Sequence, residues 1–163
     1  MLPIFITLVR WTMPWSNERL LIVDDDSSIR ESLSLVLTEI GYSVRAAEDG
    51  FSALLEIRKE TPDIILSDLH MPGMSGFEFL SMVRCRFPAI RVIAMSGAFS
   101  GDEVPSGVVA DAFYQKGSSL GALLMIMGTL PRMERHPSCL FGSTMPMLKP
   151  AQVLSPSSQT GTQ

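Results

Sequence analysis

Four short apolar runs stand out in the middle of the chain, and each is followed by a polar side chain. Continuous runs of this kind are typical of strands in a parallel sheet that is covered on both faces. A fifth, weaker strand is expected at residues 43–46. The four runs and the residues that follow them are Leu20–Val23 before Asp24, Asp63–Ser67 before Asp68, Arg91–Met95 before Ser96, and Ala112–Gln115 before Lys116.

The segment after the first run has the spacing of an amphipathic helix. Apolar residues recur at helical intervals between Ile29 and Ile40. Ser28, with Glu31 three residues later, fits a capping box, and Gly41 fits the end of a helix. The pattern therefore predicts a first helix that is capped by Ser28 and stops at Gly41.

Further helices are predicted between the other runs. Residues 98–110 should hold one of them, but glycine and proline disfavour it, so we expect this region to be short, mobile or partly unwound. Strands that alternate with helices imply right-handed crossovers, and therefore an α/β fold with a doubly wound, five-stranded parallel sheet and helices on both faces. The remaining helices are expected at residues 52–59, 76–86 and 119–130.

The middle of the chain differs in composition from both ends. Residues 18–130 hold 16 acidic and 9 basic side chains, a net charge of −7, whereas the whole chain of 163 residues carries −4. A chain of this length fits one domain, which we expect at residues 18–130. We interpret residues 1–17 as a flexible extension or a misassigned start, and residues 131–163 as a disordered tail.

Composition also excludes several classes of function. An acidic domain gives no electrostatic support for nucleic-acid binding. The apolar run at residues 1–9 is too short to span a membrane and lacks the basic residues that begin a signal peptide. Cys85 and Cys139 form neither a disulfide framework nor a zinc site, which favours a reducing compartment, namely the cytoplasm.

The polar residues that follow the strands would converge in this fold, because ligands bind at the carboxyl ends of parallel strands. Clustered carboxylates repel one another, and a lysine together with Mg²⁺ supplies the missing positive charge. Such a site suits phosphoryl transfer, in which cations stabilise the phosphoryl oxygens, a hydroxyl donates a hydrogen bond and a carboxylate attacks in line to give an aspartyl phosphate. The converging residues are Asp24, Asp25, Asp26, Asp68, Ser96 and Lys116.

Four motifs, taken in order, carry a resemblance to a known family. They are Leu-Leu-Ile-Val-Asp-Asp-Asp at 20–26, Ile-Leu-Ser-Asp-Leu-His-Met-Pro-Gly-Met-Ser-Gly at 65–76, Ile-Ala-Met-Ser-Gly-Ala at 93–98, and Phe-Tyr-Gln-Lys at 113–116. Over roughly residues 18–130 the chain resembles the receiver domain of response regulators in two-component signalling. The resemblance implies a flavodoxin-like sheet with strand order 2-1-3-4-5.

The resemblance also implies a phosphoacceptor and its metal ligands. Asp68 would accept the phosphoryl group, and Asp24 and Asp25 would be the acidic pair that holds Mg²⁺ together with Asp68. His70 would bind the metal through its backbone carbonyl. His70 and Ala98 also occupy positions at which the family tunes dephosphorylation.

Three more residues complete the implied site, and one neighbour departs from the family pattern. Ser96 would donate a hydrogen bond to the phosphoryl group, and Lys116 would form an ion pair with it. Ser96 and Phe113 would be the switch residues. The family usually has proline after the lysine, whereas Gly117 stands there in this chain, so the lysine would be less rigidly aimed.

The leading hypothesis is a stand-alone receiver, phosphorylated by a sensor histidine kinase or a phosphotransfer protein. It would act through contacts with an unknown downstream protein, without nucleic acid or membrane. It would be a phosphoacceptor switch rather than an enzyme, with only self-directed phosphoryl transfer and autodephosphorylation.

Two alternatives stay open. One is a receiver-like binding module that works without phosphorylation. The other is a haloacid-dehalogenase-like phosphatase. The pattern Asp24-x-Asp26 resembles the nucleophile loop of that family. That family, however, needs an acidic pair after the lysine, and only Glu134 follows Lys116 in this chain.

Overall fold

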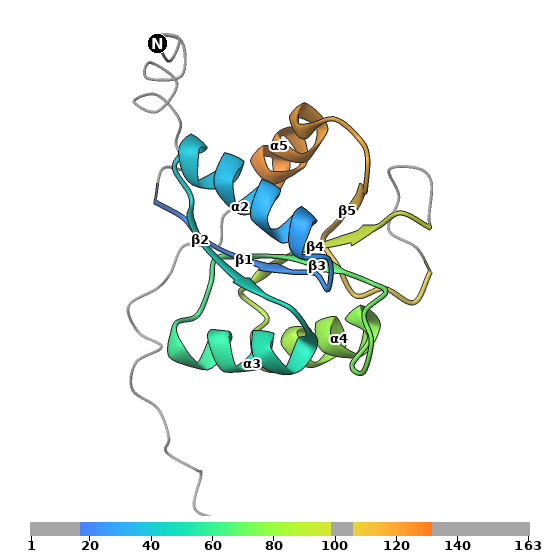
Figure 1. The fold of residues 1–163 in the computed structure, drawn as a ribbon. Coiled ribbons are helices and arrows are strands. Elements are labelled where there is room, and N and C mark those ends of the chain that lie inside the picture. The colour runs from blue at the N-terminus through green and yellow to red at the C-terminus, as the bar shows by residue number, and fades with distance from the viewer. Residues whose placement is uncertain (1–16, 99–105, 132–163) are drawn as a thin grey trace, which may run out of the picture. The chain divides into compact units, whose positions relative to one another are not determined.

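The structure, a computed structural model, describes residues 17–98 and 106–131. Its strands form one parallel sheet in the order β2-β1-β3-β4-β5, which confirms the predicted fold and strand order (Figure 1). The strands are β1 (Arg19–Val23), β2 (Ser43–Ala47), β3 (Ile64–Asp68), β4 (Arg91–Ser96) and β5 (Ala112–Gln115).

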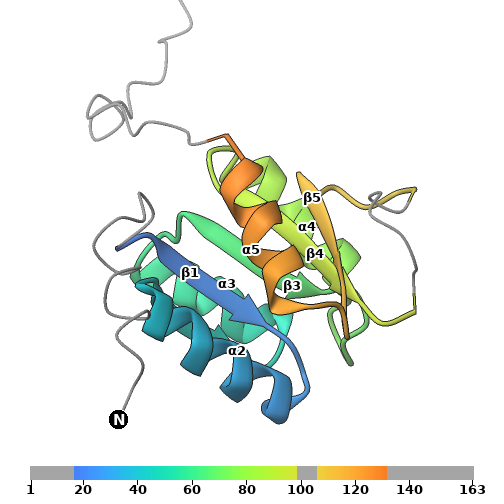
Figure 2. The ribbon, with the colours of Figure 1, turned by 90° about the horizontal axis from the view of Figure 1, so that it is seen from above.

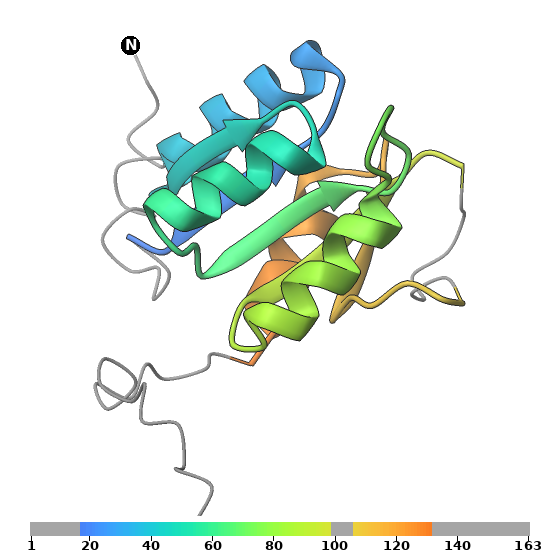
Figure 3. The same ribbon diagram turned by 90° about the horizontal axis from the view of Figure 1, so that it is seen from below.

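Helices cover both faces of this sheet, as the alternating pattern predicts. Helices α2 and α5 lie over one face (Figure 2), and α3 and α4 lie over the other (Figure 3). No helix in the part of the chain that the structure describes is long and apolar enough to cross a membrane. The helices are α2 (Ser27–Ile40), α3 (Gly50–Lys59), α4 (Gly76–Arg86) and α5 (Leu120–Thr129).

The sheet separates two hydrophobic clusters. Alternate residues of each strand point to opposite faces, so Leu21 packs in the cluster under α3 and α4, whereas Leu20 and Ile22 pack in the cluster under α2 and α5. Because both faces are covered, all four residues from Leu20 to Val23 are buried. This is the physical reason why the strands are continuous apolar runs in the sequence.

The cap of α2 differs from the sequence prediction. Oδ1 of Asp26 accepts hydrogen bonds from the backbone N–H of Ser28 at 2.8 Å and of Ile29 at 3.4 Å, so Asp26 is the N-cap residue. The predicted Ser28–Glu31 capping box is wrong, because Ser28 already lies inside the helix. The predicted stop is confirmed, since α2 ends at Gly41 with a φ of +120°.

The helix α4 has the predicted limits, and its first residue fixes the path of the chain after β3. A capping box formed by Ser75 and Glu78 begins the helix. A Cβ atom on Gly76 would lie 2.0 Å from the backbone oxygen of Asp68 and 2.6 Å from Cα of Leu69. Only glycine allows the loop to return this closely across the end of β3.

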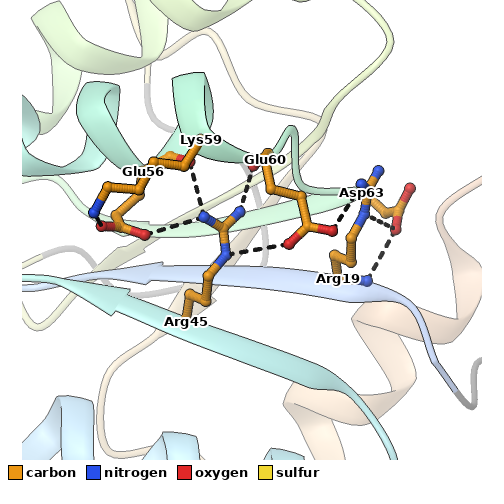
Figure 4. Close-up of polar contacts among 6 residues, drawn as sticks. All are labelled: Arg19, Arg45, Glu56, Lys59, Glu60 and Asp63. Carbon is orange, nitrogen blue, oxygen red and sulfur yellow. Dashed lines mark hydrogen bonds and ion pairs between the residues drawn. The ribbon is translucent and has the colours of Figure 1, made fainter.

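A polar cluster joins α3 to the strands β1 and β2 (Figure 4). Arg45 of β2 donates hydrogen bonds to the carbonyl oxygens of Glu56 and Glu60 at the end of α3, and it pairs with the Glu56 carboxylate at 3.0 Å. Arg19 of β1 pairs with Glu60 at 3.2 Å and with Asp63 at 3.4 Å. Arg19 and Asp63 lie at the amino ends of β1 and β3, so this cluster is a structural support away from the carboxyl ends.

Several predicted segments fall partly or wholly outside the described residues. The weak helix expected at 98–110 does not form at 106–110, and residues 99–105 lie outside the described part. Nearly all of the predicted extension (1–17) and tail (131–163) also lies outside it, so the domain limits stay predictions.

Candidate functional site

The carboxyl ends of four neighbouring strands bring the predicted site residues to one edge of the sheet. Asp24 follows β1, Asp68 ends β3, Ser96 ends β4 and Lys116 follows β5. The pairing register aligns these ends, since Asp68 lies opposite Met95, the residue before Ser96.

The ammonium group of Lys116 bridges two carboxylates of the site. Its Nζ lies 2.7 Å from Oδ2 of Asp68 and 2.8 Å from Oδ2 of Asp24. Partial burial of Lys116 lowers its pKa, but hydrogen bonds and charge attraction from Asp24 and Asp68 outweigh burial, so the net pKa is raised. Lys116 is therefore a fixed positive charge at neutral pH.

Asp24 is the deepest carboxylate of the site. Its side chain is fully buried, and this burial raises its pKa, while the hydrogen bond from Lys116 opposes the shift. Its Oδ1 accepts a hydrogen bond from the backbone N–H of Asp26 at 3.0 Å. Its Oδ2 is buried, and among the described residues Lys116 Nζ, at 2.8 Å, is its polar partner.

Arg30 supports Asp24 from the first turns of α2, a contact that the sequence analysis missed. Its Nη1 donates a hydrogen bond to the backbone oxygen of Asp24 at 2.6 Å. The available signal was spacing alone, because Arg30 lies six positions after Asp24, across the start of the helix. The contact ties the loop that carries Asp24 and Asp25 to α2.

Three carboxylates form a cluster that suits a hard cation. Oxygen atoms from Asp24, Asp25 and Asp68 all lie within 4.8 Å of one another, and Asp25 is exposed to solvent. Mg²⁺ prefers oxygen ligands and keeps several waters, which this partly open set permits. The under-bonded Oδ2 of Asp24 and the excess of negative charge over Lys116 also fit a divalent cation. The expected role of the His70 carbonyl as a further ligand stays a prediction.

Ser96 is fully buried at the end of β4, and its hydroxyl makes two polar contacts. The backbone N–H of Ala98 donates a hydrogen bond to Oγ at 3.1 Å, and Nδ1 of His70 lies 3.2 Å from the same atom. The backbone N–H of His70 also donates to Oδ1 of Asp68 at 3.2 Å. The resemblance places His70 at a position that tunes dephosphorylation, and the contact of its imidazole with Ser96 was not predicted from the sequence.

A glycine turn aims Lys116 where the resemblance leads one to expect proline. Gly117 has a φ of +91°, which proline cannot adopt, and the N–H of Ser118 donates to the carbonyl of Gln115 at 3.1 Å to close the turn. The Tyr114 hydroxyl donates to the carbonyl of Ser118 at 2.8 Å. Lys116 is thus presented by a hydrogen-bonded turn.

Phe113, the expected aromatic switch residue, is 2% exposed. It packs in the hydrophobic cluster under α3 and α4. The ring therefore lies inward while Ser96 Oγ contacts His70. Its part in switching stays a prediction.

The sequence profile of the response regulator receiver domain matches residues 20–115, more than half of the chain. The chain belongs to this family. Receiver domains of this kind are the signalling switches of two-component systems rather than conventional enzymes, and they bind Mg²⁺ in an acidic pocket. Among the described residues, Asp24, Asp25 and Asp68 form an acidic cluster that could hold such an ion.

Individual relatives support the same membership. The DNA-binding transcriptional regulator NtrC of Klebsiella pneumoniae is 41% identical over 92 residues, which are 56% of this chain and 20% of NtrC. Chemotaxis protein CheY4 of Vibrio cholerae has a TM-score of 0.61 at 30% identity, covering 69% of this chain and 98% of CheY4.

A third similar structure includes a partner. A chain from the crystal structure of histidine kinase ThkA in complex with response regulator protein TrrA matches with a TM-score of 0.62 at 30% identity, covering 68% of this chain and 96% of the matched chain. This receiver spans about a fifth of the length of the NtrC relatives that it matches.

Proposed function

We propose that this receiver accepts a phosphoryl group on Asp68 in a Mg²⁺-dependent reaction and thereby controls contacts with another protein. The observation that carries the proposal is the position of Lys116, whose Nζ touches both Asp24 and Asp68 beside a third carboxylate. That arrangement puts a nucleophilic carboxylate, a fixed cation and a set of hard oxygen ligands in one place.

The side chains have distinct parts in the proposed step. A carboxylate oxygen of Asp68 forms a bond to phosphorus while the bond from phosphorus to the donor imidazole breaks, and the departing nitrogen keeps the electron pair. Lys116 moves from pairing with the Asp68 carboxylate to pairing with a phosphoryl oxygen, and Ser96 donates a hydrogen bond to another. Bound Mg²⁺ would neutralise charge on the carboxylates and on the phosphoryl oxygens.

The proposed donor is a sensor histidine kinase or a phosphotransfer protein. The similar receiver fold in the ThkA–TrrA complex supports a histidine kinase as partner. Water would later attack the aspartyl phosphate and reset the switch, so the domain would catalyse its own dephosphorylation. We further propose that it works as a stand-alone receiver in the cytoplasm, with an unknown downstream protein as its target.

The phosphatase alternative loses its main support. Asp26, the second acid of the Asp24-x-Asp26 pattern, caps α2 through hydrogen bonds to Ser28 and Ile29. Glu134, the only acid that follows Lys116 in the sequence, lies outside the described residues. An assay with a generic phosphate ester distinguishes the two functions, because a receiver should show almost no turnover.

A beryllofluoride titration tests the proposal against a module that works without phosphorylation. Beryllofluoride mimics a phosphoryl group on a carboxylate, so with Mg²⁺ it should shift the backbone amide signals of Ser96 and Lys116 in NMR spectra. Asp68→Asn should abolish these shifts. Asp111→Asn is the charge-matched control and should keep them, because Asp111 pairs with Arg84 and accepts from the Val92 N–H near the amino end of β4, away from the site. Wild-type spectra that do not change with Mg²⁺ and beryllofluoride would favour the phosphorylation-independent module.

A further inference from the structure

The hydroxyl of Ser96 is engaged by a side chain that the proposed phosphoryl transfer does not use. Nδ1 of His70 lies 3.2 Å from Ser96 Oγ, and the N–H of Ala98 already donates to that oxygen at 3.1 Å. A serine hydroxyl has one proton to donate. The Ala98 N–H occupies one of the two lone pairs of that oxygen, and in the imidazole tautomer that carries its proton on Nε2, Nδ1 accepts the hydroxyl proton.

We propose that His70 is a latch that holds the Ser96 hydroxyl proton in the unphosphorylated protein and so opposes switching. The inference rests on the proposed function, in which a phosphoryl group on Asp68 needs this same proton. His70 and the phosphoryl group compete for one donor, and phosphorylation has to break the His70–Ser96 hydrogen bond.

Two contacts hold the imidazole in place for this role. The backbone N–H of His70 donates to Oδ1 of Asp68 at 3.2 Å, which anchors the main chain beside the phosphoacceptor. The imidazole also packs against the ring of Phe77, which lies in the first turn of α4. The two rings meet edge to face, with centroids 6.3 Å apart and an interplanar angle of 82°. Aromatic pairs favour this edge-to-face geometry, so Phe77 limits the positions open to the imidazole.

The latch makes His70 a positioning residue that acts through Ser96. A neutral hydrogen bond adds a modest net free energy, so its loss should tighten the binding of a phosphoryl mimic by about 3- to 10-fold. Side-chain substitution at residue 70 keeps the backbone carbonyl and N–H in the chain, and the N–H bond to Asp68 does not involve the imidazole. A change in binding that His70→Asn does not share then reports the loss of the acceptor at Nδ1.

The first test is a beryllofluoride titration of the full chain with Mg²⁺, followed through the Ser96 amide signal. His70→Ala should bind about 3- to 10-fold more tightly than wild type, because the hydroxyl proton is released. His70→Asn should bind nearly as wild type does, since its Oδ1 stands at the same number of bonds from Cβ as Nδ1 and accepts the same proton. Equal or weaker binding by His70→Ala would overturn the latch.

The second test needs no phosphoryl mimic. ¹⁵N NMR of the His70 ring should show Nδ1 without a proton and Nε2 with one. Ser96→Ala should shift the Nδ1 signal. A protonated Nδ1, or a signal that Ser96→Ala leaves unchanged, would overturn the latch. If the spectra of wild type do not change with beryllofluoride, the proposed phosphorylation is contradicted. The NMR measurement of the His70 ring then still tests whether His70 accepts the Ser96 proton.

Discussion

Lys116 Nζ lies 2.7 Å from Oδ2 of Asp68, so the ammonium group of the site forms an ion pair with the proposed nucleophile. The same ammonium pairs with the fully buried Asp24 at 2.8 Å. One positive charge thus serves three clustered carboxylates, with Asp25 as the third. We predict that this unbalanced charge governs both the stability of the domain and its affinity for Mg²⁺.

Lys116→Met should destabilise the metal-free protein by about 1–3 kcal/mol, because it leaves the buried Asp24 carboxylate without its cation. Mg²⁺ should then stabilise Lys116→Met more than it stabilises wild type, since binding to the folded state shifts unfolding by mass action. Urea unfolding in a chelator and in Mg²⁺ measures both effects.

Lys59→Met is the matched control for this change. Lys59 also pairs with a carboxylate, Glu56 at 2.6 Å, but its side chain is 69% exposed. Exposed ion pairs contribute little, so we expect a change within about 0.5 kcal/mol and no dependence on Mg²⁺. Equal behaviour of the two variants would contradict a special role for Lys116.

Gly76→Ala should destabilise the domain by about 1–3 kcal/mol or more, because the new Cβ would meet the backbone of Asp68 at 2.0 Å. Backbone cannot move aside as a flexible side chain can. Gly121→Ala, in α5, is the control. The new Cβ would have only Ser119 Oγ near it, at 3.8 Å, so this substitution should stabilise the helix by up to about 1 kcal/mol. Thermal unfolding of both variants checks the opposite signs.

Gly117→Pro should disturb the site, although proline is the residue that the family resemblance leads one to expect there. Its φ of +91° lies outside the range of proline, so the turn that presents Lys116 would have to open. We expect weaker beryllofluoride binding together with lower stability. The control is Gly107→Ala, at a φ of +85°, which should lower the stability of the domain but leave beryllofluoride binding unchanged. Beryllofluoride binding by Gly117→Pro as tight as that of wild type would show that the turn does not position the lysine.

Asp49 should contribute a pH-dependent stability that is separate from the functional site. A hydrogen bond from the Ser52 backbone N–H, at 2.7 Å, lowers the pKa of this N-cap carboxyl below its usual 3.8. A lowered folded-state pKa gives stability that is present above pH 3.8 and is lost as the pH falls from 3.8 through the folded-state pKa.

Asp49→Asn isolates this contribution, because the amide oxygen still accepts a hydrogen bond at the cap but carries no charge. The stability advantage of wild type over Asp49→Asn should therefore shrink as the pH falls below 3.8. Urea unfolding across that range measures it. A difference that stays constant with pH would show that the carboxyl pKa is not lowered by folding.

Much of the fold was predictable because the sheet is buried on both faces. The continuous runs at Leu20–Val23 and at residues 63–67 require cover on both sides, and that requirement fixes a doubly wound sheet. Helix α4 was predicted at its observed limits, since Gly76 begins and Pro88 follows a clear helical segment.

Local hydrogen-bond choices were less predictable. Ser28 and Asp26 are both residue types that favour an N-cap. The glutamate three residues after Ser28 favours Ser28, whereas Asp26 is the observed cap. The register of the turn decides between them, and the sequence does not reveal it.

The site residues follow strand ends, so Asp24, Asp68, Ser96 and Lys116 could be placed together from the sequence. The contacts of side chains from loops and helices could not, because they depend on rotamers. Arg30 on the Asp24 carbonyl and His70 on Ser96 belong to this group. Glycine at position 117 predicts a less rigidly aimed lysine, whereas its positive φ allows a hydrogen-bonded turn to form.

The most direct test of the central claim is labelling with a small phosphodonor, mapped by peptide mass spectrometry. In Mg²⁺ the wild type should gain one phosphoryl group on the peptide that contains Asp68, and a chelator should abolish the gain. Asp68→Asn should remain unlabelled, while Asp111→Asn should label as wild type does. Labelling of Asp68→Asn to the level of wild type would contradict the account.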